Sequence, residues 1–130
     1  MAGLVEDNFL IVGDRSTLYQ LDLGNGSAEK IHEDPEGRIR KVAFDPVEKK
    51  IYWLNEQQYI RRANLNGTDN ETIYTGNVNT FEVDPVSRLV YYTPAWNNAG
   101  IYVMTLDGRH HFMITPGRPG YIISLHPTRG

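Results

Sequence analysis

The stretch Lys50-Ile51-Tyr52-Trp53-Leu54-Asn55, followed closely by Tyr59-Ile60-Arg61-Arg62-Ala63-Asn64-Leu65-Asn66-Gly67, decides the fold. Two short runs rich in β-branched and aromatic residues flank a polar turn, which is typical of a β-hairpin. The closing Asn-Gly pair predicts a second tight hairpin, because a type I′ turn needs positive φ at both central residues. No part of the chain shows the 3.6-residue period of an amphipathic helix. The sequence therefore predicts antiparallel β-structure.

Parts of this stretch recur along the chain with a period of about 40 residues. A repeat of that length is expected for one four-stranded blade of a β-propeller. The 130 residues thus predict an all-β fold of three blades. The recurring anchors are Phe44-Asp45-Pro46, Val83-Asp84-Pro85 and Leu125-His126-Pro127; Ile51-Tyr52-Trp53 and Val90-Tyr91-Tyr92; and Asn64-Leu65-Asn66-Gly67, Thr105-Leu106-Asp107-Gly108 and, more loosely, Leu21-Asp22-Leu23-Gly24-Asn25-Gly26.

The repeats divide the chain into blades at residues 4–34, 37–76 and 77–115, with a closing strand within 118–127. The first blade has only three expected strands, and Tyr121–Leu125 resembles the innermost strand that it lacks. The expected strands are Asn8–Gly13, Thr17–Leu23 and Ala28–His32; Ile39–Phe44, Lys50–Leu54, Tyr59–Leu65 and Glu71–Tyr74; and Asn79–Val83, Leu89–Thr93, Gly100–Leu106 and His111–Ile114.

The motif Tyr52-Trp53-Leu54-Asn55 and the segment after it resemble a blade of the YWTD propellers, the six-bladed domains of low-density-lipoprotein-receptor-like proteins. The resemblance implies half of a six-bladed ring and a protein-binding role in an extracellular parent protein. The next blade departs from the motif with Tyr91-Tyr92-Thr93-Pro94, and the first blade has no Tyr-Trp pair. The family's buried Thr and Asp tie neighbouring blades together, so the resemblance implies a thinned or rewired network here.

Three blades leave two terminal faces uncovered, whereas closed propellers typically have four to eight blades. Exposed apolar faces of that kind mark interaction surfaces. We expect a second copy of the chain to complete the ring, with Tyr121–Leu125 inserted reciprocally into the partner's first blade under two-fold symmetry. The alternative is a complementary half-propeller of different sequence.

Composition and motifs narrow the function classes. The net charge of -3 argues against nucleic acid, since no excess of basic residues exists to neutralise phosphates. No apolar run is long enough to span a membrane, and Met1-Ala2-Gly3-Leu4 has no signal-peptide pattern. The chain has no cysteine, and its Ser and His residues show no catalytic order, so we expect no enzyme activity, cofactor or metal site. The alternatives are an engineered or trimmed half-propeller without a native ligand, a structural matrix module, and a metal-dependent six-bladed hydrolase.

A ligand is expected over the channel mouth, on the face formed by the loops between second and third strands and between blades. Candidate binding residues on that face are Trp96, Asn97, Asn98, Arg118 and Tyr59. Trp and Tyr are common hot-spot residues, although Trp96 packed against the next blade is the alternative. The acidic Glu33, Asp34 and Glu36 are interpreted as a solvated turn. Three glycosylation sequons begin at Asn25, Asn66 and Asn70.

Overall fold

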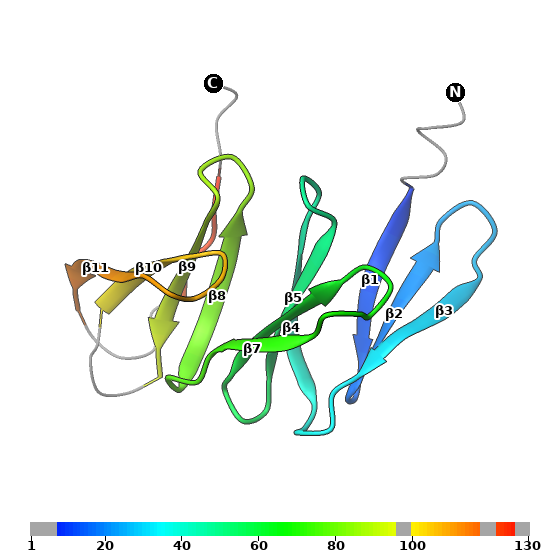
Figure 1. Ribbon diagram of the computed structural model, residues 1–130, viewed down its shortest axis with the longest axis horizontal. Helices are drawn as coiled ribbons and strands as arrows, with labels where there is room; N and C mark the ends of the chain where they lie inside the picture. Colours follow the sequence, from blue (N-terminus) through cyan, green and yellow to red (C-terminus); the bar gives the residue numbers. More distant parts are fainter. Residues whose placement is uncertain (1–7, 96–99, 118–121, 127–130) are drawn as a thin grey trace.

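The computed structural model describes residues 8–95, 100–117 and 122–126. Within those ranges it contains eleven strands, no helix, and three antiparallel sheets that stand side by side (Figure 1). The first sheet is β1(Phe9–Asp14), β2(Thr17–Asp22) and β3(Ala28–Glu33). The second is β4(Ile39–Asp45), β5(Lys50–Asn55), β6(Ile60–Asn64) and β7(Glu71–Tyr74). The third is β8(Val78–Asp84), β9(Leu89–Pro94), β10(Gly100–Thr105) and β11(His111–Pro116).

Each sheet is a meander in which consecutive strands pair, the arrangement predicted for propeller blades. The expected strands of all three blades are present with ends shifted by a residue or two. The first sheet has three strands, as predicted, so β1 has no partner along its inner edge among the residues that the structure describes. The described part of the expected closing strand, 122–126, joins no sheet in the single chain. Its expected pairing is with another chain and stays a prediction.

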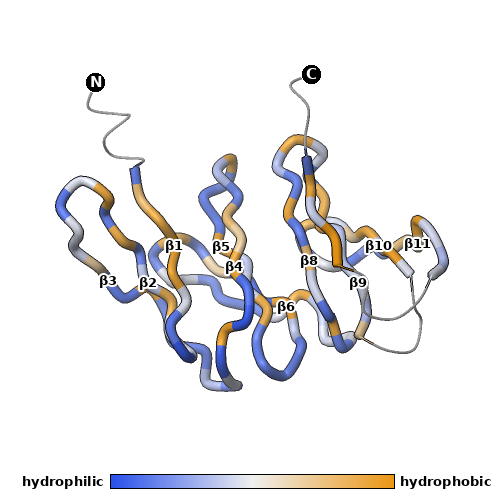
Figure 2. The backbone as a smooth tube through the Cα atoms, turned by 180° about the vertical axis from the view of Figure 1, so that it is seen from behind, coloured by the Kyte–Doolittle hydropathy of each residue, from blue (hydrophilic) through white to orange (hydrophobic). Residues whose placement is uncertain are grey.

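The core fills the two junctions between sheets. Side chains alternate across a strand, so Ile51 and Trp53 of β5 face the first sheet, where they meet Leu18. Tyr52 and Leu54 face the third sheet, where Phe81 lies in the same buried cluster. Figure 2 shows how hydropathy varies along the backbone: β1 is hydrophobic, whereas the loop between β5 and β6 is hydrophilic. The second sheet is therefore buried on both faces.

At each junction, a glycine in a turn of one sheet packs against the backbone of the preceding sheet. Gly67 follows β6 at φ +86°, and a Cβ there would lie 2.3 Å from the carbonyl oxygen of Ile31 in the preceding sheet. Gly108 repeats this contact one blade later, where a Cβ would lie 2.1 Å from the Ile73 carbonyl oxygen. Only glycine combines that φ with so close a backbone approach. The two junctions therefore share one geometry.

The outer faces of the first and third sheets carry exposed apolar side chains, as expected for uncovered blades. Leu10 and Val12 of β1 are 50% and 36% exposed, and Phe112 and Ile114 of β11 are 63% and 52% exposed. In a closed propeller such residues would be covered by the next blade.

Candidate functional site: the loop face and the junctions beneath it

Four loops of the described residues lie along one edge of the molecule, the lower edge in Figure 1, and we call this edge the loop face. The loop face comprises residues 15–16, 34–38, 56–59 and 75–77. Backbone hydrogen bonds link each loop to the following strand or loop. The N–H groups of Ile39 and Val78 donate to the carbonyl oxygens of Arg15 and Gln58, at 2.6 and 3.0 Å.

A second set of backbone bonds continues this ladder. The N–H of Glu56 donates to the Arg38 carbonyl oxygen at 2.8 Å, and the N–H of Ala95 donates to Asn77 at 2.7 Å. The Arg38 N–H returns a bond to the Glu56 carboxylate at 3.1 Å. The first set repeats from one junction to the next and the second repeats from one blade to the next, so the loops are held in a defined arrangement that continues across all three blades.

Left-handed residues shape these loops. Arg15, Gln58 and Asn77 have φ of 56°, 68° and 59°. Such values are uncommon for non-glycine residues, and they occur together where the loops reverse direction. Each of these three residues supplies a carbonyl oxygen to the ladder, so the hydrogen bonds hold backbone conformations that would otherwise be disfavoured.

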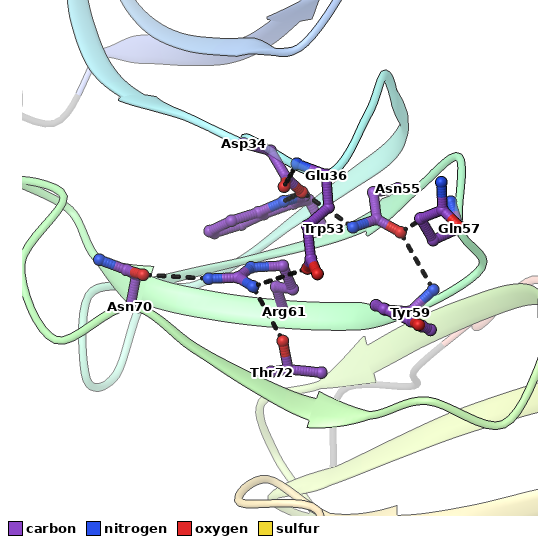
Figure 3. Close-up of polar contacts among 9 residues, drawn as sticks. All are labelled: Asp34, Glu36, Trp53, Asn55, Gln57, Tyr59, Arg61, Asn70 and Thr72. Carbon is purple, nitrogen blue, oxygen red and sulfur yellow. Dashed lines mark hydrogen bonds and ion pairs between the residues drawn. The ribbon is translucent and has the colours of Figure 1, made fainter.

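Asp34, the first residue of the 34–38 loop, is buried and joins the first blade to the second (Figure 3). Its carboxylate is buried, with the residue 2% exposed, and its Oδ2 accepts bonds from Trp53 Nε1 at 2.8 Å and Asn55 Nδ2 at 3.0 Å. Its Oδ1 accepts from the Glu36 N–H at 2.8 Å. Burial acts to raise the pKa of Asp34, but these hydrogen bonds outweigh burial and lower the pKa below its ordinary value.

The interpretation of the acidic segment as a solvated turn is therefore wrong for Asp34, although Glu33 and Glu36 are exposed. A buried indole N–H normally requires an acceptor, and Asp34 meets that requirement for Trp53. An acidic residue in the link before a Trp-containing blade is the sequence signal that could have identified it.

Asn55 extends this junction into the loop face. Its Oδ1 accepts from the N–H groups of Gln57 and Tyr59, at 3.0 and 3.1 Å, while its Nδ2 donates to Asp34. One buried side chain thus fixes both the blade junction and the conformation of the β5–β6 loop. An Asp-Trp-Asn arrangement therefore joins the blades at the first junction.

Arg61 lies against the same network, with its guanidinium 5.8 Å from the Trp53 ring centroid. Its Nη1 donates to Glu36 at 3.2 Å and to Thr72 Oγ1 at 2.9 Å, and its Nη2 donates to Asn70 at 3.0 Å (Figure 3). The positive charge of Arg61 is thus surrounded by polar groups from the 34–38 loop, from β7 and from the turn before β7.

The second junction uses different chemistry. Tyr92 occupies the position of Trp53, and its hydroxyl lies 2.8 Å from His111 Nδ1. Its ring contacts those of Tyr74 and Tyr102, with centroids 4.9 and 5.5 Å apart. Burial raises the pKa of Tyr92, and neighbouring Tyr74 adds to the effect. At the position of Trp53, an aromatic cluster therefore takes the place of the polar network.

Of the predicted binding residues, the structure places Tyr59 on the loop face, half-buried beside Asn55. Trp96, Asn97, Asn98 and Arg118 lie outside the described residues. The exposed side chains of the described loop face are Arg15, Pro35, Glu36, Arg38, Glu56, Gln57, Thr75 and Asn77. Sequence reasoning did not select Arg38, Glu56 or Gln57 individually, because only the ladder shows that they share one rigid surface.

The polar groups described here hold loops and blades together. Within residues 8–95, 100–117 and 122–126, no cluster of three or more His, Cys, Asp or Glu side chains is arranged to hold a metal ion. No helix capable of crossing a membrane occurs in the described part of the chain. What the loop face can do chemically is present mixed charges, amides and a tyrosine on a fixed backbone.

No family model matches the sequence. The fold is similar to a chain of the nidogen/laminin complex, with a TM-score of 0.71 and 23% identity, over 82% of this chain and 43% of that one. It is similar to the tricorn protease (0.62, 22%, over 81% and 11%) and to a complex of S. cerevisiae Dbp5 with Nup159 and Gle1 (0.61, 14%, over 86% and 29%). This chain thus spans less than half of each matched chain. At these identities the likeness shows the fold alone, three blades of a β-propeller.

Proposed function

We propose that this chain is a non-catalytic protein-binding scaffold, half of a six-bladed propeller of the receptor-ectodomain type, whose loop face takes a protein or peptide ligand. The ring is completed by assembly with a second copy of the chain. The YWTD-like motif of the second blade supports an extracellular setting. The similarity of the fold to a chain of the nidogen/laminin complex supports the same setting.

The observation that carries this proposal is the backbone ladder across the loop face. Binding costs less free energy when the surface is already ordered, and here each loop is fixed to a neighbouring element before any ligand arrives. The side chains presented are suited to protein contacts, with Arg38, Glu56 and Gln57 exposed around the half-buried Tyr59. The buried carboxylates Asp34 and Asp45 are engaged in blade junctions and are not available for acid–base chemistry.

The test is a selection of displayed random peptides on the immobilised chain, followed by affinity measurement. Selected peptides should bind the wild type and lose at least tenfold in affinity for Arg38→Glu or Tyr59→Ala. The matched control is Val86→Lys, which alters an 80% exposed side chain in the β8–β9 turn, on the opposite edge, and should leave affinity unchanged. Peptides that bind all variants equally, or no enrichment at all, would contradict a loop-face binding function.

A further inference from the structure

The two uncovered faces of this chain correspond to the two halves of one interface. Blade repeats align Leu10, Val12 and Leu21 with Ile51, Trp53 and Ala63, which are the side chains that face the preceding blade at the first junction. They align Ile114 with Ile31 and Ile73, which face the following blade at the two observed junctions. The first sheet therefore lacks a preceding blade, and the third sheet lacks a following one.

The backbone at Gly26 also indicates that the first sheet lacks a preceding blade. It occupies the corresponding turn to Gly67 and Gly108 and shares their positive φ, at +76°, but a Cβ there would meet no described atom within 4 Å. Its two counterparts lie against the carbonyl oxygens of Ile31 and Ile73. The carbonyl expected to meet Gly26 is that of Ile114, whose side chain is 52% exposed at the other end of the molecule.

The missing inner strand leaves a groove beside β1. The groove has a volume of ≈ 250 Å³ and is lined by Phe9, Leu10 and Ile11 of β1 and by Val42, Ala43 and Phe44 of β4. Its apolar lining and the unpaired edge of β1 suit an added β-strand, since main-chain bonds and alternate side chains would both be satisfied.

Residues 122–126 have the burial pattern of that strand. Ile123 and Leu125 are half-buried, whereas Ile122, Ser124 and His126 are exposed. The alternation has the period of two expected for a strand with one face covered. Ser124 aligns with Ala43 of the inner strand β4, so a small residue stands at the position that faces the following blade.

This segment follows β11 of the third sheet, whereas β1 belongs to the first sheet. The second sheet lies between the first and third sheets (Figure 1), with β1 against β4 and β4 against β8. We propose that two copies close a six-bladed ring by reciprocal strand exchange. In this ring, residues 122–126 of each copy pair with the partner's β1, and the third blade covers the partner's first blade. This proposal rests on the proposed scaffold function, but its test involves no ligand.

The test uses mass in solution, measured by light scattering at micromolar concentration. The wild-type chain should have twice its 14.8 kDa mass. Val12→Lys and Ile114→Glu alter opposite faces of the same interface, so each variant alone should be monomeric. Mixed one to one, they should restore the dimer, because one of its two interfaces is then wild type and the other opposes Lys to Glu. Val86→Lys, away from both faces, should stay dimeric.

Gly26→Ala keeps the test decisive where a charged variant fails to fold, because the added methyl group meets none of the described residues. It should weaken dimerisation at least tenfold while the circular dichroism spectrum stays that of the wild type. A monomeric wild type, an assembly larger than two copies, no recovery on mixing, or a Gly26→Ala dimer of unchanged affinity would each overturn strand exchange. Loss of peptide binding with the dimer intact would count against the scaffold function alone.

Discussion

Arg88 holds the buried carboxylate of Asp45 across the second junction, with Nη1 and Nη2 each 2.8 Å from one carboxylate oxygen. Asp45 is fully buried, whereas the Arg88 side chain is 31% exposed and also lies 3.3 Å from Glu48. Bidentate Arg–carboxylate pairs are strong and directional. This pair ties the turn after β8 to the end of β4, and so fixes the angle between two blades.

Replacing Arg88 by Met should therefore destabilise the fold, because the Asp45 carboxylate stays buried without its cation. The urea midpoint should fall clearly below that of Arg109→Met, which removes an 80% exposed side chain 3.7 Å from Asp107. Adding Asp45→Asn to Arg88→Met should recover part of the loss. Equal midpoints for the two arginine variants would contradict the structural role of this pair.

Trp53→Phe removes the indole N–H that donates to Asp34. The variant should lose about 1–3 kcal/mol of unfolding free energy, because a buried carboxylate loses one of its donors. The matched change one blade later is Tyr92→Phe, whose hydroxyl partner His111 is exposed. That variant should lose only about 0.5–1.5 kcal/mol. Urea unfolding followed by circular dichroism compares them; a Tyr92→Phe loss as large as that of Trp53→Phe would contradict the importance of the Asp34 network.

Stability should decrease at acid pH through Asp34. Its pKa is lower in the folded chain than in the unfolded chain, so the unfolded state binds more protons as pH falls. The stabilisation is present above the unfolded pKa of about 3.9 and is lost as pH falls toward the lower folded pKa. Urea midpoints between about pH 5 and pH 2.5 should therefore fall less steeply for Asp34→Asn than for the wild type. Parallel curves would contradict the lowered pKa.

Gly67→Ala and Gly26→Ala separate backbone strain from steric overlap. Both positions have positive φ, and the left-handed conformation costs about 1–2 kcal/mol for an alanine. Gly67→Ala also forces a methyl group against the Ile31 carbonyl oxygen, whereas the methyl group of Gly26→Ala meets no atom of the part of the chain that the structure describes. On the Val12→Lys background, where the chain is expected to be monomeric, Gly67→Ala should lower the urea midpoint more. Equal losses would show that strain alone acts at both turns.

The local signals of this chain were sufficient to predict its blades. Strand positions followed from runs such as Lys50–Asn55 and from the Asn66-Gly67 and Asp107-Gly108 turns, because hairpin geometry depends on a few neighbouring residues. The three-stranded first sheet followed from the place of the repeats. Less of the predicted binding site can be compared with the structure, because four of its five predicted residues lie outside the described ranges and only Tyr59 could be placed.

By itself, the sequence determined the fold class, the number of blades and the alternation that buries both faces of β5, since these depend on local turn chemistry and on a side-chain period of two. Only the tertiary structure decided which polar residues join the blades. Asp34 and Trp53 are 19 residues apart in the chain, and Asp45 and Arg88 are 43 apart. Such pairs form because sheet packing brings distant turns together and excludes water from them, and that proximity depends on the packing of whole sheets rather than on the chemistry of a single turn.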